Sequence, residues 1–316
     1  MNNLNKTPIV SVIMSVYNAE KYLEKAIKSI LTQTFDNFEF IIINDASTDD
    51  SLNIIHSFLD DRIRLIEKEK NKGFKGFVEN LNLGLDLAKG KYIARMDADD
   101  IAHPTRFKKQ INFLEHKPHI FMVGSSMDLI DESDNYIKKL SAVKDHQSIV
   151  KRFNYDNPMY HPALMYRRTE IRYRDVFRGC EDFDFHLQHL SKGLKFENIE
   201  ESLIKYRILE NSISRSDHKI SKLIALECAR DSFVLRENSN INSDFDVEVK
   251  FDIRNSQFTK EERMYNLNVA LRYNSPIYSE LLTFYQLNFL RYKIFKQPLL
   301  RKLYSKLILR FQPKIK

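Results

Sequence analysis

Residues 9–16 have the sequence IVSVIMSV, a short apolar run that is rich in β-branched side chains. Such a run is typical of a strand that is buried on both faces of a sheet. A second apolar run, FEFIII, follows at 38–43. Between the two runs, apolar side chains recur at the spacing of one helix face, at Leu23, Ala26, Ile27, Ile30 and Leu31. Residues 9–43 therefore predict a strand, a helix and a second strand.

The alternation of strands and helices continues to about residue 96. The pattern predicts helices at 49–59 and 74–88, the second with Gly90 at its C-cap, and strands at 62–66 and 91–96. Strands that alternate with helices usually form one mostly parallel, doubly wound sheet, so the predicted fold class is α/β. Ligands of such sheets bind at the carboxyl ends of the strands, and we expect the site there.

After Asp100 the pattern becomes less regular. The elements expected in this part are helices at 104–115 and 182–190 and strands at 120–123 and within 194–207. From about residue 211 the pattern is mainly helical. We therefore predict two regions, an α/β domain at 1–210 and a mainly helical region at 211–316.

Positive charge is concentrated near the end of the sequence. The 316 residues carry a formal net charge of +7, but residues 281–316 contain nine Lys or Arg and no acidic residue. Residues 1–280 carry 41 basic and 43 acidic side chains. Because most of the protein is then close to neutral, we expect no nucleic-acid partner.

The basic segment has the pattern of an amphipathic helix at 299–311. One half of the helix is apolar and the other half carries Arg301, Lys302 and Lys306. Such a helix can bind the surface of an anionic membrane, with roughly 1 kcal/mol from each basic side chain near the surface. The alternative is an ordinary helix that packs on the α/β domain with its basic face in water.

The sequence predicts a cytoplasmic location with peripheral membrane contact. No apolar run reaches the roughly 18 residues that a membrane-spanning helix needs. The first eight residues do not have the pattern of a signal peptide. Two cysteines, Cys180 and Cys228, are too few for a disulfide framework and fit a reducing compartment.

The distribution of glycine excludes two kinds of nucleotide site. All seven glycines lie between Gly73 and Gly193, so the first strand-to-helix turn, SVYNAEKY at 15–22, contains none. Dinucleotide-binding and P-loop motifs need glycines in that turn, because backbone amides must approach a phosphate. A nucleotide would have to be bound in another way.

The most informative segment for chemistry is ARMDADD at 94–100, at the end of a predicted strand. The carboxylates of Asp97, Asp99 and Asp100 would repel one another, and Asp45 at the end of another strand is a possible neighbour. Residues two apart in an extended segment point the same way, so Asp97 and Asp99 can bind one Mg²⁺ or Mn²⁺. These residues alone leave open an acidic loop or helix N-cap without a metal.

Four segments together resemble the family 2 glycosyltransferases, which have the GT-A fold. They are SVIMSVYNAEKYLEKAIKSILTQTF at 11–35, FIIINDASTDDS at 40–51, LNLGLDLAKGKYIARMDADDI at 81–101 and CEDFDFHLQ at 180–188. The resemblance covers roughly residues 9–210. It implies that the predicted α/β domain at 1–210 binds a nucleotide sugar and is catalytic.

The resemblance implies roles on the donor side. Asp97 and Asp99 match the pair that holds a divalent metal ion, Mn²⁺ or Mg²⁺, at the donor diphosphate, so Asp97 also contributes to donor binding. Asp45 matches an acidic residue that contacts the nucleoside, while Ser15 and Tyr17 match residues that line the base pocket. The sequence departs from the frequent DDGS segment of the family at Asn44 and Ala46.

Further matches concern the acceptor and the diphosphate. Asp182 in CEDFD matches the catalytic base of inverting members, with Glu181 as the fallback. Arg207 lies in KYRILENSIS, which resembles a segment beside the donor diphosphate. His161 falls where family members often have acceptor-side residues.

The activity that the resemblance implies is inverting, metal-dependent transfer of one hexose. The donor would be a UDP-sugar carrying glucose, galactose or an N-acetylhexosamine. The acceptor would be a polyprenyl-diphosphate-linked glycan in O-antigen, capsule or lipooligosaccharide synthesis, at the cytoplasmic face of the inner membrane. The sequence has no Trp, so the signature of processive synthases is absent. Transfer to a polyprenyl phosphate and a non-catalytic membrane-surface binding module with the same fold are the alternatives.

Overall fold

The computed structural model describes residues 7–153, 156–175, 177, 179–209 and 229. These residues fall into two compact units. The first contains the described residues up to Asp175 and from Gln188 to residue 209, and the second contains 177, 179–187 and 229. The predicted helical region beyond residue 210 lies outside the described residues except for residue 229, and the segment 299–311 and Cys228 lie outside them entirely. None of the described helices is long and apolar enough to cross a lipid bilayer.

The first part of the chain alternates strands and helices as predicted. The elements are β1 (Val10–Val16), α1 (Glu20–Leu31), β2 (Phe38–Asn44), α2 (Ser51–His56), β3 (Ile63–Glu67), α3 (Gly73–Leu87) and β4 (Tyr92–Arg95). Their bounds lie within one or two residues of the predicted ones, except that α2 ends three residues early. The periodicity of side chains therefore suffices to predict this part of the fold.

The second part contains more short elements than predicted. They are β5 (Ile101–Ala102), α4 (Arg106–His116), β6 (Ile120–Ile130), β7 (Tyr136–Leu140), α5 (His146–Arg152), the 3₁₀ helix η1 (His161–Ala163), β8 (Met165–Arg167), α6 (Glu181–Leu190) and β9 (Lys195–Arg207). The sequence predicted only the first four residues of β6, because Ser125, Ser126 and Asp128 interrupt its apolar run.

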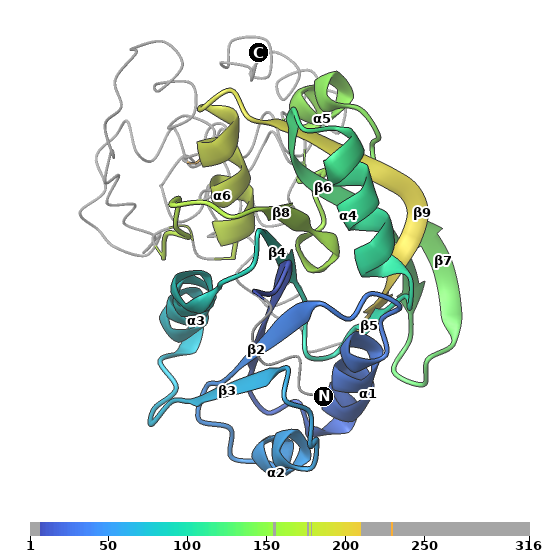
Figure 1. Cartoon of the computed structure of the whole chain (residues 1–316). Helices are drawn as coiled ribbons and strands as arrows, with labels where there is room; N and C mark the ends of the chain where they lie inside the picture. The colour runs from blue at the N-terminus through green and yellow to red at the C-terminus, as the bar shows by residue number, and fades with distance from the viewer. Residues whose placement is uncertain (1–6, 154–155, 176, 178, 210–228, 230–316) are drawn as a thin grey trace, which may run out of the picture. The chain divides into compact units, whose positions relative to one another are not determined.

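Nine strands of the described residues form one mixed sheet, in the order β3-β2-β1-β4-β8-β6-β9-β5, with β7 paired to β6 (Figure 1). Strands β3, β2, β1 and β4 are parallel to one another, and β6 is parallel to β9. The other four pairings are antiparallel. The prediction of a mostly parallel sheet is therefore correct for the first four strands and wrong for the whole sheet. One physical reason is that β7 follows β6 through a short hairpin turn, a connection that joins antiparallel strands.

The side chains of β1 alternate between two helical layers. Val10, Val12, Met14 and Val16 are fully buried in a core that includes side chains of α1, α2 and α4. Ile13 and Ser15, on the other face of β1, meet α3 at Gly84 and Asn80. The parallel part of the sheet is therefore covered by α3 on one face and by α1, α2 and α4 on the other (Figure 1).

The carboxyl ends of β1, β2 and β4 lie at one edge of the sheet. Val16 pairs with Asn44, and Ile13 pairs with Arg95. The register continues past the strands, since the N–H of Asp45 donates to the carbonyl of Val16 at 2.8 Å. The polar residues that follow these three strands therefore share this edge, as predicted.

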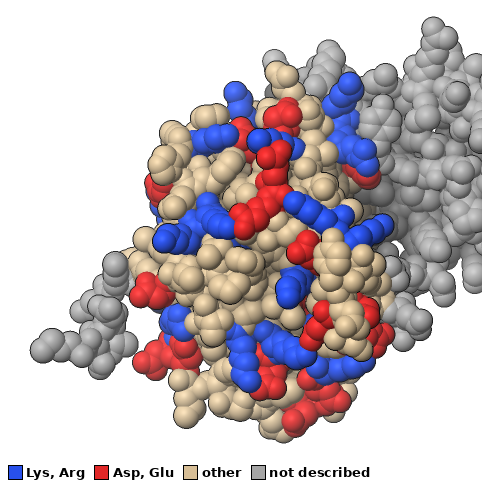
Figure 2. All heavy atoms as spheres, turned by 90° about the vertical axis from the view of Figure 1, so that its right-hand side faces the viewer, with Lys and Arg blue, Asp and Glu red and all other residues tan. Residues whose placement is uncertain are grey.

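Basic and acidic side chains intermix on the face that Figure 2 shows. Some ion pairs of the protein join β9 to residues outside the helices and strands, with Lys117 at 2.5 Å from Glu197 and Lys144 at 3.2 Å from Glu200. Exposed pairs of this kind contribute at most about 1 kcal/mol each. Ion pairs of this kind therefore add little to the stability of the fold.

The sequence predicted Gly90 as the C-cap of α3, and this prediction is wrong. The helix ends at Leu87, and the next residue, Ala88, is already extended. A Cβ atom on Gly90 would lie 2.5 Å from the backbone nitrogen of Ser11 and 2.7 Å from the carbonyl carbon of Val10. Gly90 is therefore needed because the chain passes too close to β1 for any side chain.

Gly90→Ala should destabilise the protein by about 3 kcal/mol, because the contact is with backbone that cannot move aside. Gly193→Ala is the matched comparison, since Gly193 has a positive φ of 73° and open space around its Cβ position. The free energy of unfolding of that variant should fall by only about 1 kcal/mol. Urea denaturation measures the free energy of unfolding of both variants. An equal decrease in the two would show that the close contact at Gly90 does not destabilise Gly90→Ala.

Candidate active site

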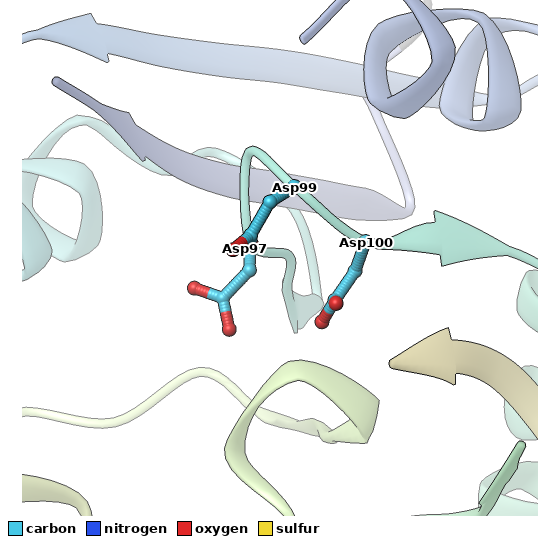
Figure 3. A group of neighbouring side chains, drawn as sticks. All are labelled: Asp97, Asp99 and Asp100. Atoms are coloured by element: carbon cyan, nitrogen blue, oxygen red, sulfur yellow. The ribbon is translucent and has the colours of Figure 1, made fainter. Parts of the chain in front are cut away.

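Three carboxylates meet in the turn between β4 and β5. Oxygen atoms of Asp97, Asp99 and Asp100 lie within 4.8 Å of one another, and their side chains extend to the same side of the turn (Figure 3). The side chain of Asp97 is 30% exposed, whereas Asp100 is only 1% exposed. The sequence predicted the convergence of Asp97 and Asp99 in an extended segment. The structure brings Asp97 and Asp99 together in a turn instead, with Asp100 in the same cluster as expected, and does not include Asp45 in the group.

Two buried arginines neutralise part of this negative charge. Arg95, which is 3% exposed, forms an ion pair with Asp97. Arg106 is completely buried and donates from Nη2 to the carbonyl oxygens of Arg95 at 2.8 Å and Leu164 at 3.0 Å. The second arginine therefore fixes the backbone from which the acidic turn starts.

The acidic side chains titrate unusually because they are buried close together. Burial, and then the charge of Asp97, raises the pKa of Asp99 to about 6. Burial and the charges of Asp97 and Asp99 raise the pKa of Asp100 well above its usual range. Burial also lowers the pKa of Arg106 to about 9. The protein alone thus leaves the negative charge of the turn incompletely balanced, which favours binding of a cation.

The donor atoms of this acidic turn fit a hard divalent cation. Mg²⁺ and Mn²⁺ prefer carboxylate oxygens and retain water or phosphate oxygens in their remaining positions. Asp100 accepts a hydrogen bond from the backbone N–H of Arg207 through Oδ1 at 2.9 Å. Its Oδ2 is buried and has no hydrogen-bond partner among the described residues. The turn is therefore consistent with the predicted metal site, and the identity of the ion remains a prediction.

Asp45 lies at the same edge of the sheet, immediately after β2. Its side chain is buried, and Oδ2 accepts a hydrogen bond from Nδ2 of Asn71 at 2.9 Å. Oδ1 has no hydrogen-bond partner among the described residues. A Cβ atom on Gly76 would lie 3.1 Å from Oδ2, so α3 approaches this carboxylate closely. Asp45 can therefore accept one more N–H or O–H group.

Ser15 and Tyr17 mark the end of β1 at this edge. The hydroxyl of Ser15 accepts a hydrogen bond from Nδ2 of Asn80 at 3.1 Å. Tyr17 is 50% exposed and is, with Tyr136, one of the two exposed Phe or Tyr side chains of the described residues. Both residues thus lie near the carboxyl end of the strand beside the one that leads to Asp45. Their roles in binding a nucleoside remain predictions, as does that of Asp45.

The turns after β1 and β2 are joined by side-chain hydrogen bonds. The backbone N–H of Thr48 donates to Oδ1 of Asn18 at 2.8 Å, and that of Asn18 donates to Oγ of Ser47 at 3.1 Å. Ala46 has a φ of 57°, a left-handed conformation that costs a non-glycine residue about 1–2 kcal/mol. The alanine at this departure from the family pattern therefore adopts a conformation that glycine would adopt freely.

Asp182 and Glu181 lie in the first turn of α6, in the second compact unit. Oδ1 of Asp182 accepts a hydrogen bond from the N–H of Phe183 at 2.7 Å, and the residue is partly exposed. Glu181 is buried. The predicted role of Asp182 as a catalytic base is neither supported nor contradicted by these contacts.

Arg207 and His161 are both buried. Arg207 is the last residue of β9, and its side chain is 0% exposed. The guanidinium group contacts Asp99, Asp131 and Asp134. His161 lies in η1, and its Nε2 is 3.0 Å from the hydroxyl of Tyr173. The predicted contact of Arg207 with the donor, and an acceptor-side role of His161, stay predictions.

Several side chains that hold the site in place were not predicted from the sequence. Arg95 lies in the buried strand β4, and a charged residue within an apolar strand is a signal that could have indicated a buried ion pair. Arg106, Asn71 and Asn80 have no comparable signal, because their partners are remote in the sequence.

Comparison with known proteins agrees with this geometry. The family described as Glycosyl transferase family 2 matches residues 11–174. The O-antigen biosynthesis glycosyltransferase WbnJ of Escherichia coli is 34% identical over 72% of this chain and 88% of its own length. WfaP of Escherichia coli, a UDP-Glc:alpha-D-GlcNAc-diphosphoundecaprenol beta-1,3-glucosyltransferase, is 31% identical over 67% of this chain and 82% of its own.

A solved structure shares the fold. The crystal structure of S. aureus TarS 1-349 in complex with UDP-GlcNAc superimposes with a TM-score of 0.59. It covers 86% of this chain and 83% of that chain, at 16% sequence identity. The likeness at this identity extends to the fold and not to the ligands.

Binding of Mn²⁺ to the full chain should weaken about tenfold between pH 7 and pH 5, because a proton on Asp99, with its pKa of about 6, competes with the metal. The raised pKa also means that the unfolding free energy of the metal-free protein falls as pH rises from about 4 to about 6 through this group. Bound metal should offset that loss. Titration calorimetry with Mn²⁺ at both pH values measures the effect.

Asp99→Asn should weaken Mn²⁺ binding and remove its pH dependence between pH 5 and pH 7. Asp61→Asn, an exposed aspartate between α2 and β3, is the control and should behave as the unchanged protein. Equal affinity of the unchanged protein at both pH values would contradict the assignment of Asp99 as a metal ligand.

Proposed function

This chain belongs to glycosyl transferase family 2, and we propose that it moves one hexose from a UDP-sugar to a lipid-linked oligosaccharide during synthesis of a surface glycan such as an O-antigen. The observation that carries the proposal is the cluster of Asp97, Asp99 and Asp100 at the carboxyl edge of the parallel strands. The names of WbnJ and WfaP support the kind of donor, acceptor and product.

The nucleoside of the donor binds beside Asp45. The buried Oδ1 of Asp45 has no partner among the described residues and can accept an N–H group of a base or a hydroxyl of a ribose. Tyr17 is exposed enough to contact a base, and Ser15 is held at this edge by its hydrogen bond from Asn80 of α3. A base that donates an N–H, such as uracil, suits this set of acceptors.

The diphosphate of the donor lies at the acidic turn, where Asp97 and Asp99 hold Mn²⁺ or Mg²⁺. When bound, the ion would act as a Lewis acid for the charge that develops on the leaving UDP. Arg95 acts indirectly, because its ion pair orients Asp97. Asp100 adds negative charge beside the two ligands. Without a counter-charge, the three carboxylates would repel a diphosphate rather than bind it.

The acceptor hydroxyl is activated by Asp182. Its oxygen attacks the anomeric carbon, the bond from that carbon to the diphosphate oxygen breaks, and the hydroxyl proton passes to the carboxylate of Asp182. Attack opposite to the leaving group inverts the anomeric configuration. The partial exposure of Asp182 is compatible with access to an acceptor.

A lipid-linked acceptor requires the enzyme to work at a membrane. We propose that the basic segment 281–316 binds the anionic cytoplasmic surface of the inner membrane, through the amphipathic pattern at 299–311. The enzyme would then be cytoplasmic and peripheral.

Asp182→Asn should leave UDP-sugar binding within about twofold and reduce transfer by about 10²–10⁴-fold, the usual contribution of a general base. Glu181→Gln is the matched variant and should retain most activity. Calorimetry with UDP and a transfer assay with a GlcNAc-diphospholipid measure the two properties. A large loss of UDP affinity in Asp182→Asn, or a larger loss of transfer in Glu181→Gln, would contradict the role of Asp182.

The proposed activity is tested by incubating the full chain with Mn²⁺ and a panel of UDP-sugars, and by measuring release of UDP. A GlcNAc-diphospholipid should stimulate release with one sugar of the panel, and EDTA should abolish it. Stimulation by a bare polyprenyl phosphate instead would identify the alternative acceptor. UDP release from none of the sugars, with either acceptor, would contradict the proposed transferase activity and favour a binding module.

A further inference from the structure

Arg207 contacts the acidic turn through both its backbone and its side chain. Its backbone N–H donates to Oδ1 of Asp100, and its Nε donates to the carbonyl oxygen of Asp99, each at 2.9 Å. The sheet brings these residues together, because Ile101 pairs antiparallel with Lys205. Asp99 and Arg207 each lie two residues beyond that pair and therefore face each other.

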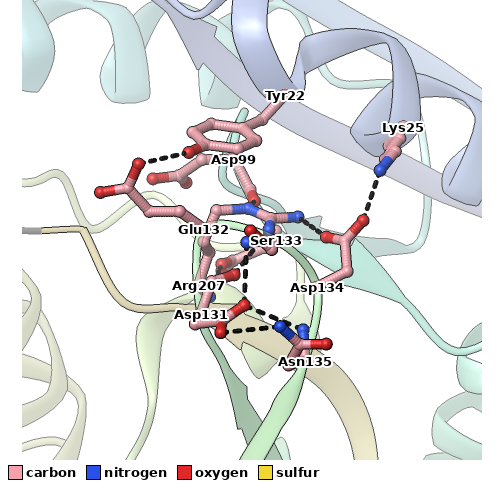
Figure 4. Close-up of polar contacts among 10 residues, drawn as sticks. Tyr22, Lys25, Asp99, Asp131, Glu132, Ser133, Asp134, Asn135 and Arg207 are labelled. Carbon is pink, nitrogen blue, oxygen red and sulfur yellow. Dashed lines mark hydrogen bonds and ion pairs between the residues drawn. The ribbon is translucent and has the colours of Figure 1, made fainter.

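The other side of the guanidinium group binds a hairpin turn. This turn, residues 131–135, connects β6 to β7. Nη1 of Arg207 donates to the carbonyl oxygen of Asp131 at 2.9 Å, and Nη2 forms an ion pair with Oδ1 of Asp134 at 2.6 Å (Figure 4). The hydrogen bonds of Nε and Nη1, together with this ion pair, join the acidic turn to the hairpin turn through one completely buried side chain.

Helix α1 covers one face of the guanidinium group of Arg207 with an aromatic ring. The ring of Tyr22 lies against it, with 4.3 Å from the guanidinium carbon to the ring centroid. The Tyr22 hydroxyl donates to Glu132 at 3.3 Å, and Lys25 pairs with Asp134, so the same helix also holds the hairpin turn (Figure 4). Stacking fixes the plane of the guanidinium group, and with it the direction of the hydrogen bond to Asp99.

We propose that Arg207 is a positioning residue that holds Asp99 and Asp100 in the arrangement that binds the divalent cation, and that the hairpin turn 131–135 is its support. The proposal rests on the proposed function of the acidic turn. It differs from the sequence-based expectation for Arg207, because the side chain acts through the backbone of Asp99 and not through the donor phosphate. Loss of such an indirect contact typically weakens metal binding by about 10–100-fold.

The test uses Arg207→Lys, which keeps the charge but not the planar set of donors. Electron paramagnetic resonance of free Mn²⁺, without donor, should show metal affinity reduced by about tenfold or more. Donor turnover should need correspondingly more Mn²⁺, while turnover at saturating Mn²⁺ falls at most about threefold. Unchanged Mn²⁺ affinity together with a raised KM for the UDP-sugar would overturn the proposal and indicate a direct donor contact.

Asp134→Asn tests the support without altering the acidic turn, and it guards against misfolding of Arg207→Lys. It should weaken Mn²⁺ binding by about two- to fivefold, since it removes the ion pair that orients the guanidinium group. Asp86→Asn is the matched control, because Asp86 forms an ion pair with Arg172 outside the acidic turn and the hairpin turn, and it should leave Mn²⁺ affinity unchanged. Equal effects of the two variants would overturn the proposal. If the unchanged protein releases no UDP, the proposed function fails, but the resonance measurement still decides the role of Arg207.

Discussion

Three carboxylates within 4.8 Å of one another are the constraint on which the carboxyl edge of the sheet depends. At an effective dielectric constant of about 20, two unit charges at that separation repel by about 3 kcal/mol. This is more than an exposed ion pair contributes to stability. The protein reduces the repulsion with buried arginines, since Arg95 pairs with Asp97, and Arg106 and Arg207 bind the backbone on either side of the turn. Burial and the neighbouring carboxylates raise the pKa values of Asp99 and Asp100, and a bound cation would oppose both effects.

The topology of the sheet supplies these partners. The parallel strands β1, β2 and β4 end at one edge and bring Ser15, Asp45 and the acidic turn to it. The mixed part of the sheet contributes the support, because β9 runs antiparallel to β5 and ends in Arg207. The parallel part therefore provides the groups that can meet a ligand, and the mixed part fixes the acidic turn. Asp99 and Arg207 are 108 residues apart in the sequence of this family 2 glycosyltransferase, and the mixed part of the sheet brings them into contact.

Much of this fold could be predicted from the sequence, and the reason is local periodicity. Strands and helices up to β4 follow from apolar spacing, and ARMDADD indicates the acidic turn. The strands β5 and β8 have only two and three residues, too few for a period to be recognised, and the exposed strand β7, YIKKL, has no apolar run. The support by Arg207 depends on strand pairing between distant segments, which no local pattern encodes. The predicted roles of Asp45, Ser15, Tyr17 and Asp182 follow from resemblance to the family and remain to be tested.

The central claim is that the acidic turn holds a divalent cation at the site of a nucleoside diphosphate. A crystal of the full chain grown with Mn²⁺ and UDP, with diffraction recorded at the manganese absorption edge, tests it most directly. The account predicts an anomalous peak at coordination distance, roughly 2.2 Å, from carboxylate oxygens of Asp97 or Asp99, with UDP phosphate oxygens on its other side. Bound UDP with no anomalous peak at these carboxylates, or a peak held by other residues, would contradict it.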